Sequence, residues 1–287
     1  MTHVLTLIAA SGTSLPAAEI AMSVGASQWQ WLGEGIAADL FLRSPLLDSA
    51  LATRLATARI DHILQPVAVR EKQLLISDMD STMIDQECID ELAGYVGLKD
   101  RVAAITERAM NGELDFKTAL RERVALLKDL PQAALSEVFT KHITFTAGAR
   151  TLVQTMRQRG AYCLLVSGGF RFFTGRVADA LGFHADEANL LEMENGKLTG
   201  RIIEPILDKE SKRSSLHRVA QEKNLPLSTS LALGDGANDL PMLLDAGLGI
   251  AYHAKPVVQQ QAHHAINYND LTAALYAQGI AKNEWKQ

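Results

Sequence analysis

Five short apolar runs constrain the fold of this chain more than any other feature of its sequence. They are separated by longer segments with helical periodicity, and they comprise residues 74–77, 161–166, 231–233, 248–251 and 265–267. A strand that is apolar along its whole length must be buried on both faces, which is typical of a parallel sheet covered by helices on each side. We therefore predict an α/β fold with a Rossmann-like parallel sheet in residues 71–287.

A long insertion separates the first two predicted strands. It covers about residues 88–145, and Leu120, Val124 and Leu127 recur in it at the i, i+4 and i+7 spacing of a helix face. The insertion is too long for a simple crossover, so we expect a helical cap at about 85–145. We place this cap over the carboxyl ends of the strands, where open α/β sheets bind ligands. A second insertion carries Asn195-Gly196 between apolar runs, which indicates a β-hairpin.

The first 70 residues follow a different pattern. Their expected elements, in chain order, are a strand at 3–10, a helix at 15–24, strands at 28–32 and 36–42, a helix at 46–58 and a strand at 62–69. We expect Ser44-Pro45 to set up the second helix, because proline is tolerated in a first turn. The apolar start lacks a basic residue and is short, so we interpret it as a strand rather than a signal peptide. The βαββαβ order predicts a small α+β domain of ferredoxin-like topology.

Charge and cysteine content limit the classes of partner. The formal net charge is −5, from 28 basic and 33 acidic residues, so we expect no overall electrostatic attraction to nucleic acid or to an anionic membrane. We expect a small-molecule substrate. The two cysteines, Cys88 and Cys163, suit neither a disulfide framework nor a zinc pattern, so we interpret them as buried thiols of a protein in the reducing cytoplasm.

Polar residues and glycines follow three of the predicted strands at the point where each strand ends. They are Asp78, Asp80, Ser81 and Thr82 after the first strand, Ser167, Gly168 and Gly169 after the second, and Asp235, Asn238 and Asp239 after the third. Lys212 opens an amphipathic helix between the last two groups. Glycine N–H groups can approach an anion closely, and parallel strands bring their carboxyl ends to one edge. Four such segments in order predict a site that handles an anion.

Each of these segments also has a plainer interpretation. Asp78 and Asp80 could cap a helix, Lys212 could be a solvated lysine, and the Ser-Gly-Gly segment could be an ordinary turn. Asp239 could cap the helix that follows it. We interpret three further residues as structural or surface histidines, namely His253, His263 and His264.

In this order and context the residues resemble the four motifs of the haloacid dehalogenase-like phosphatase superfamily. Within this superfamily, several segments resemble the phosphoserine phosphatase family more specifically. These segments are 78–84 with Glu87, 109–112 with Phe116, 120–124, 167–170 and 234–239. It extends from about residue 74 to the C-terminus. Only the position of the motif lysine is loose, because Lys209 lies three residues before Lys212.

The resemblance implies a two-step hydrolysis with named roles. Asp78 is the expected nucleophile, which forms an aspartyl-phosphate. Asp80 is the expected general acid and base: it begins protonated, protonates the departing oxygen, and then takes a proton from water. Ser167, the Gly168 N–H and Lys212 are expected to hold the other phosphoryl oxygens.

The resemblance also implies a magnesium ion and a substrate. Asp78, Asp235 and the backbone carbonyl of Asp80 are the expected Mg²⁺ ligands, with Asp239 behind them as a residue that orients a bound water or Lys212. The residues expected to bind the substrate besides Ser167 and Gly168 are Glu87, Met110, Phe116, Arg123 and Asn238. The implied reaction is hydrolysis of L-phosphoserine to L-serine and phosphate, the last step of phosphorylated serine biosynthesis.

Several alternatives stay open at this point. The enzyme could act on another small phosphomonoester, as a phosphatase or a phosphotransferase. A dehalogenase of the same fold would not need Asp80, and a phospho-acceptor receiver domain would be shorter and would lack the cap. By topology alone, residues 1–70 resemble an ACT-like amino-acid-binding domain, which could sense serine, form a homodimer, or do neither.

Overall fold

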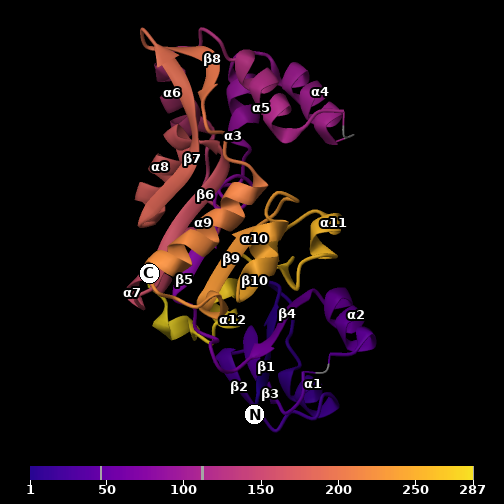
Figure 1. Cartoon of the computed structure of the whole chain (residues 1–287). Helices are drawn as coiled ribbons and strands as arrows, with labels where there is room; N and C mark the ends of the chain where they lie inside the picture. Colours follow the sequence, from indigo (N-terminus) through magenta and orange to yellow (C-terminus); the bar gives the residue numbers. More distant parts are fainter. Residues whose placement is uncertain (46, 111–112, 287) are drawn as a thin grey trace.

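The computed structural model describes residues 1–45, 47–110 and 113–286, which form two β-sheets and a helical cap. Figure 1 shows the small sheet at one end of the molecule, the large sheet in the middle and the cap at the other end. The helices within the described ranges include none that combines the length and the apolar character needed to cross a bilayer.

The small sheet has the predicted βαββαβ order. Its elements are β1 (His3–Ala9), α1 (Ala17–Ser23), β2 (Gln28–Gly33), β3 (Ala37–Leu42), α2 (Ser49–Thr57) and β4 (Ile60–Pro66). The strands are antiparallel in the order β2-β3-β1-β4. Both helices pack on one face of this sheet, where their apolar side chains share a buried cluster with those of the strands. The expectation that Ser44-Pro45 starts α2 is wrong. Asp48 caps this helix by accepting a hydrogen bond from the Leu51 N–H at 2.6 Å.

The large sheet contains the five predicted strands and a hairpin. Its strands are β5 (Leu74–Ser77), β6 (Tyr162–Phe170), β7 (Ala185–Glu194), β8 (Lys197–Ile203), β9 (Ser230–Gly234), β10 (Leu248–Tyr252) and β11 (His264–Ile266). Their order is β11-β10-β9-β5-β6-β7-β8, and every pairing is parallel except that of β7 with β8. The α/β fold class is therefore confirmed, and β5 lies at the centre of the sheet.

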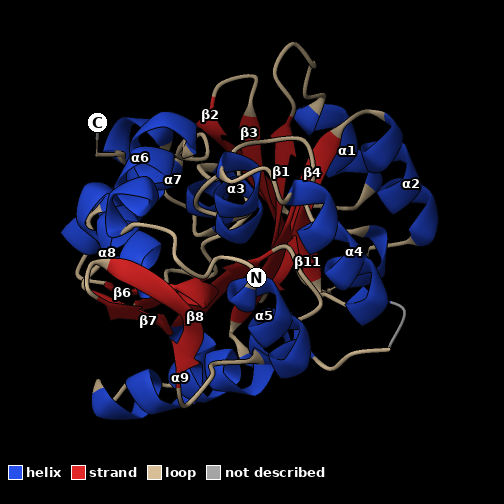
Figure 2. Ribbon diagram, turned by 90° about the horizontal axis from the view of Figure 1, so that it is seen from above, coloured by secondary structure: helices blue, strands red, loops and turns tan. Residues whose placement is uncertain are grey.

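Helices cover both faces of this sheet (Figure 2). One face packs against α7 (Ala149–Gln158) and α8 (Arg171–Leu181), and the other against α9 (Lys209–Glu222) and α10 (Leu240–Asp245). The remaining elements are α11 (Pro256–Gln259), α12 (Ala273–Ala277) and the 3₁₀ turns η1 (Leu227–Thr229) and η2 (Lys282–Glu284). The central strands are thus buried on both sides, as their continuous apolar sequence requires.

The cap consists of α3 (Cys88–Tyr95), α4 (Lys99–Met110), α5 (Phe116–Ala125) and α6 (Gln132–His142). Two linkers join it to the body, and they are bonded to each other. The Asp85 N–H donates to the Thr144 carbonyl at 3.1 Å, and the Gln86 amide exchanges hydrogen bonds with the Thr144 N–H and hydroxyl at 2.9 and 2.8 Å. The predicted helical insertion therefore forms a unit with two adjacent connections.

The β7–β8 hairpin forms a second attachment for the cap. Asn195 and Gly196 make its turn with φ values of 50° and 74°, the left-handed conformation that an Asn-Gly turn favours. On β8, Leu198 exchanges backbone hydrogen bonds with the loop between α5 and α6: its N–H donates to Leu130 and its carbonyl accepts from Asp129, both at 2.9 Å. The cap therefore rests on an extension of the large sheet.

The small sheet packs on the large body through both apolar and ionic contacts. Ile8 and Ile63 belong to the same buried apolar cluster as Leu275 of α12. Arg70 forms a two-point ion pair with Asp39 at 2.5 and 2.6 Å and donates to the Ala277 carbonyl at 2.9 Å. Asp39 is fully buried, and a buried carboxylate left without its partner typically costs about 3–5 kcal/mol. The predicted domain boundary near residue 70 thus lies at an interface where the small sheet and the body pack tightly together.

Candidate active site

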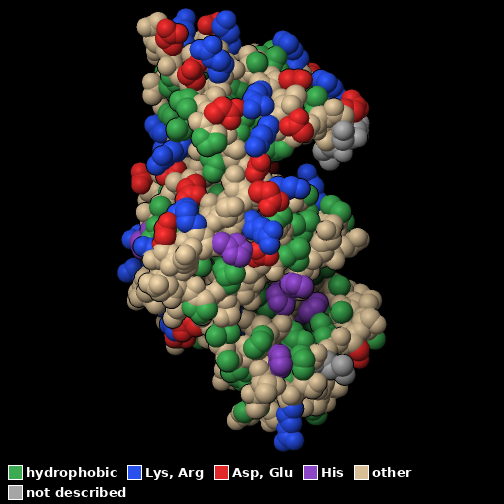
Figure 3. Space-filling model, in the orientation of Figure 1, with side chains coloured by type: hydrophobic (Ala, Val, Ile, Leu, Met, Phe, Trp, Pro, Cys, Tyr) green, Lys and Arg blue, Asp and Glu red, His purple; other side chains and the backbone are tan. Residues whose placement is uncertain are grey.

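The predicted motifs meet in one cavity beneath the cap. It has a volume of about 350 Å³ and lies at the carboxyl ends of β5, β6 and β9. Figure 3 shows acidic and basic side chains at the hollow between the cap and the body. Nine of the predicted site residues line the cavity: Asp78, Asp80, Glu87, Phe116, Arg123, Ser167, Gly168, Asp235 and Asn238.

Lys212 lies between two carboxylates, one of which, Asp78, lines the cavity. Its Nζ is 2.7 Å from Asp78 Oδ2 and 2.6 Å from Asp239 Oδ1, and the lysine is only 2% exposed. Burial opposes the charge on Lys212, but the carboxylates of Asp239 and Asp78 outweigh that effect and raise its pKa. The lysine is therefore a fixed cation beside the predicted nucleophile, not the solvated lysine of the alternative interpretation.

Asp80 is held by two donors from different parts of the chain. Its Oδ1 accepts from the Cys88 N–H at the start of α3 at 2.8 Å, and its Oδ2 accepts from the Ser167 hydroxyl at 3.0 Å. Burial raises the pKa of Asp80, although these hydrogen bonds oppose the shift. A carboxyl group with a raised pKa suits a residue that must donate a proton first and accept one later.

The last residues of β6 bring backbone close to Asp80. The Gly169 N–H donates to Ser167 Oγ at 2.8 Å, and a Cβ at Gly169 would lie only 2.9 Å from Asp80 Oδ2. Asn189 on β7 donates to the Gly168 carbonyl at 2.7 Å and so fixes the peptide that directly follows the Gly168 N–H expected to bind phosphate. Only glycine at 169 lets this turn approach the carboxyl group without a clash.

Three carboxylates in the site can hold a metal ion. One oxygen each from Asp78, Asp235 and Asp239 lie within 4.8 Å of one another. When ionised, they carry three negative charges against the single positive charge of Lys212, and like charges at this range repel strongly in a poorly solvated site. Burial and the nearby Asp239 raise the pKa of Asp235 to about 6. A hard divalent cation fits both the all-oxygen donor set and the excess negative charge.

The cap contributes a carboxylate, a guanidinium and an aromatic ring. Glu87 accepts from the Ser81 hydroxyl at 2.8 Å, and burial followed by the charge of Asp80 raises its pKa to about 7. Arg123 lines the cavity and donates through Nε to the Ala119 carbonyl at 3.3 Å, one turn earlier in α5. The Phe116 ring lies within 3.2 Å of the position that a Cβ on Gly168 would take.

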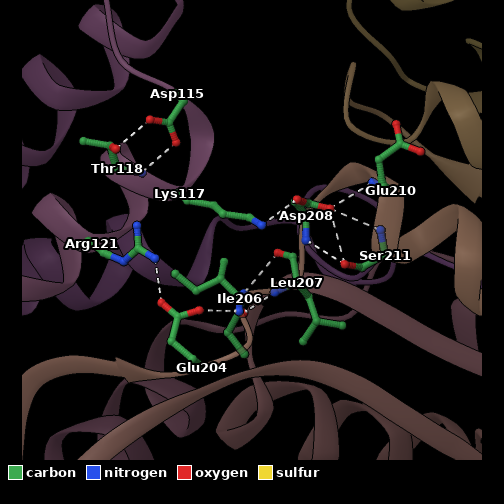
Figure 4. Close-up of polar contacts among 11 residues, drawn as sticks. Asp115, Lys117, Thr118, Arg121, Glu204, Ile206, Leu207, Asp208, Glu210 and Ser211 are labelled. Carbon is green, nitrogen blue, oxygen red and sulfur yellow. Dashed lines mark hydrogen bonds and ion pairs between the residues drawn. The ribbon is translucent and has the colours of Figure 1, made fainter.

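Two ion pairs connect the cap helix α5 to the segment that leads into α9 (Figure 4). Lys117 pairs with Asp208 at 3.1 Å, and Arg121 pairs with Glu204 at 2.6 Å. Asp208 is also the N-cap of α9, where its Oδ1 accepts from the Ser211 N–H at 3.2 Å. The helix that carries Lys212 and the helix that carries Arg123 are therefore joined outside the cavity.

Sequence reasoning missed several residues of the site. The cavity is also lined by Ile89, Asp90, Thr106 and Lys255, which the sequence analysis did not single out, and by Leu120, Gly169, Phe170 and Gly236, which lie in its motif segments without an assigned role in substrate binding. Lys255 lies three residues after the last residue of β10, so the end of that predicted strand was a usable signal. The Cys88 N–H carried no signal, because a backbone donor depends on where α3 begins. Of the predicted residues, Met110 is the last residue of α4, and its side chain lies outside the described part of the structure.

A family model confirms what this geometry suggests. The model described as haloacid dehalogenase-like hydrolase matches residues 75–244, which include every motif residue from Asp78 to Asp239. The chain belongs to the haloacid dehalogenase-like hydrolase family. It is an enzyme with an α/β fold, and the matched segment covers the inserted cap and the body from β5 almost to the end of α10.

Curated relatives show which members of this family the chain resembles. The chain is 47% identical over 208 residues to the phosphoserine phosphatase of Polaromonas sp., covering 71% of this chain and 88% of that protein. It is 42% identical over 240 residues to the phosphoserine phosphatase of Streptomyces coelicolor, covering 83% of this chain but 58% of that longer protein.

Solved structures agree with both the body and the small sheet. A probable phosphoserine phosphatase from Vibrio cholerae superposes with a TM-score of 0.80 at 31% identity, covering 99% of this chain and 88% of that one. A phospho-aspartyl intermediate analogue of phosphoserine phosphatase superposes with a TM-score of 0.66 at 38% identity, covering 72% and 98%. The first match extends the similarity to nearly the whole chain, including the N-terminal sheet.

Proposed function

We propose that this protein is a Mg²⁺-dependent phosphoserine phosphatase, which releases L-serine and phosphate in serine biosynthesis. The observation that carries the proposal is the meeting, in one cavity, of an Asp78–Lys212 pair and the Asp80 carboxyl group with cap residues of both charges. The Asp78–Lys212 pair and the Asp80 carboxyl group suit phosphoryl transfer. The charged cap residues suit a substrate with both an ammonium and a carboxylate.

In the first step, Asp78 Oδ attacks phosphorus and the bond from phosphorus to the serine oxygen breaks. Asp80 gives its proton to that oxygen, so L-serine leaves as a neutral alcohol and Asp78 carries the phosphoryl group. In the second step, a water attacks phosphorus while Asp80 takes its proton, and the bond to Asp78 breaks to release phosphate. Lys212, Ser167 and the Gly168 N–H compensate the charge on the phosphoryl oxygens.

The metal ligands in this proposal are Asp78, Asp235 and the Asp80 carbonyl, with Asp239 behind them. Magnesium would supply charge neutralisation for the phosphoryl oxygens and for the carboxylates. Asp239 already accepts from Lys212 and, through Oδ2, from the Gly236 N–H at 3.0 Å. It is therefore placed to hold Lys212 and the motif turn in position.

We propose further that residues 1–70 form an ACT-like domain and that the catalytic domain spans 71–287, with its cap at about 85–145. The two separate sheets and the paired linkers at Asp85 and Thr144 support this division. A homodimer through the small domain belongs to the same proposal, and the sedimentation of the full chain tests it.

Phosphate release from a panel of small phosphomonoesters tests the proposed function. We expect L-phosphoserine to have the highest kcat/KM in the presence of Mg²⁺, and we expect activity to disappear when the metal is removed by a chelator. Panel members that lack the ammonium, the carboxylate or both separate the contributions of the two groups. A phosphomonoester without either group that is turned over as efficiently as L-phosphoserine would contradict the assigned substrate.

Arg123→Ala is expected to reduce kcat/KM for L-phosphoserine by about 10- to 100-fold, because a desolvated hydrogen bond to a charged group contributes about 1.5–3 kcal/mol. Hydrolysis of p-nitrophenyl phosphate, which has no carboxylate, should change little. Arg121→Ala is the matched control, since Arg121 lies on the same helix but pairs with Glu204 outside the cavity. If Arg123→Ala lowers kcat/KM equally for both substrates, Arg123 supports the cap and does not bind the substrate carboxylate.

A further inference from the structure

A second cavity lies between the small sheet and the edge of the large sheet. Its volume is about 600 Å³, and its walls come from α2 and β4 on one side and from α11, β11 and the loop after it on the other. Its lining is mixed: Leu47, Ile60 and Leu64 provide apolar surface. A volume of this size is typical of small-molecule sites. The proposed phosphatase reaction does not use this cavity.

Three imidazoles from two sheets line the cavity. His62 comes from β4, His264 from β11, and His263 directly precedes β11. Figure 3 shows histidine side chains gathered in the hollow between the small sheet and the body. A neutral imidazole keeps one N–H donor and a protonated one has two, so the cluster offers several donors to an anion.

The acidic group nearest to these imidazoles is already occupied. Asp61 is 2% exposed, and its Oδ1 accepts from the Asn267 N–H at 2.8 Å. Its Oδ2 accepts from the Tyr268 N–H at 3.1 Å and from the N–H and side-chain amide of Asn269 at 3.2 and 2.9 Å. Among the described residues that line the cavity, Asp61 is the only one with an acidic side chain. The imidazoles therefore have no carboxylate of their own to accept their hydrogen bonds.

The electrostatics of His264 reflect this arrangement. Burial, followed by the charges of His263, His62 and Lys72, lowers its pKa to about 4. Burial also lowers the pKa of His62, although Asp61 opposes that shift. Burial and the neighbouring positive charges disfavour the protonated form, and an anion among the three rings would act in the opposite direction.

We propose that this cavity is a second ligand site, which binds a small organic anion with its acidic group among His62, His263 and His264 and its carbon skeleton against Leu47, Ile60 and Leu64. The occupant bridges the two sheets, because donors from both would contact the same acidic group. The site also has a direct connection to the active site. Helix α11 has Lys255 before its first residue, in the active-site cavity, and Gln259 at its other end, in the second cavity.

The affinity of this site should depend on pH in one direction. The anion favours the protonated imidazoles, so it raises the pKa of His264 and His62 on binding, and binding takes up protons. Affinity therefore rises as the pH falls from about 8 toward 6, where the protonated forms become accessible. A tenfold gain in affinity between about pH 8 and about pH 6 corresponds to an imidazole whose pKa is about 7 in the complex and well below 6 without the ligand.

The full chain is titrated with sodium succinate and, separately, with inorganic phosphate, while the imidazole C–H resonances are followed by NMR at about pH 6 and about pH 8. We expect succinate to shift the resonances of His62, His263 and His264 and to bind about tenfold more tightly at the lower pH. Phosphate distinguishes a site for any oxyanion, where both probes shift these resonances, from a carboxylate site, where only succinate does. Unchanged resonances with both probes would overturn the proposal.

Variants locate the binding. The His62→Gln/His264→Gln double variant should lose succinate binding, while His217→Gln, an exposed histidine of α9 that pairs with Asp245, should retain it. The NMR titration of the unmodified chain stands by itself if the double variant does not fold. Undiminished binding by a folded double variant would place succinate elsewhere, for example in the catalytic cavity, and would contradict the second site.

Discussion

Asp78→Asn should reduce kcat for L-phosphoserine by about 10⁴-fold or more, because the substitution removes the attacking oxygen and a metal ligand together. The folded structure should survive. Burial and the neighbouring Asp239 already raise the pKa of Asp78, against the influence of Lys212, so the metal-free protein carries a cost for that charge. Asparagine has nearly the same volume and removes this charge, so the melting temperature without metal should not fall.

Quench-flow or steady-state phosphate release measures the rate, and circular dichroism measures the melting transition. Asp179→Asn on the exposed side of α8 is a control for the loss of one negative charge far from the cavity. With L-phosphoserine that is radiolabelled in its phosphoryl group, acid-quenched samples taken during turnover should retain label bound to the unmodified chain. Asp78→Asn should retain none. Turnover by the folded variant at more than a few per cent of the normal rate would assign the nucleophile to another residue.

The sequence was most informative about the large sheet, for a physical reason. The segment 74–77 is apolar at its first three positions, ends on Ser77 and forms β5 with those bounds, because a central strand has no solvent face to accommodate. The start of α2 was harder to place. Ser44-Pro45 and Asp48 are all plausible starts, and only the formed turn shows that the Asp48 carboxylate reaches the Leu51 N–H.

The same distinction applies to the site. Asp78, Asp80 and Asp235 follow buried strands, so their convergence could be predicted from the common direction of parallel strands. The bonds that tune them could not. The Cys88 N–H reaches Asp80 only because α3 begins at that residue, and Asn189 reaches Gly168 from the neighbouring strand β7. Such partners are set by tertiary packing and leave no mark in the local sequence.

Lys212→Met should have the second large effect, on stability as well as on rate. In the metal-free protein the lysine is the cation that separates Asp78 from Asp239, at 2.7 and 2.6 Å. Methionine retains most of the buried chain but leaves two buried carboxylates facing each other. Removing one partner of a buried pair typically costs about 3–5 kcal/mol, so the free energy of unfolding should fall by that amount. The loss of a donor to the phosphoryl oxygens should lower kcat by about 10²- to 10³-fold.

The metal dependence of this variant separates a catalytic lysine from a merely structural one. A divalent cation bound by Asp78 and Asp235, in front of Asp239, replaces part of the missing positive charge, so Mg²⁺ should raise the melting temperature of Lys212→Met more than that of the unmodified chain. The rate should not recover with it, because the metal does not restore the lysine's hydrogen bond to phosphate. Lys209→Met, at the exposed first residue of α9, is the matched control and should leave both quantities unchanged. If Mg²⁺ restores stability and rate together, Lys212 serves only to compensate the carboxylates, and another donor must hold the phosphoryl group.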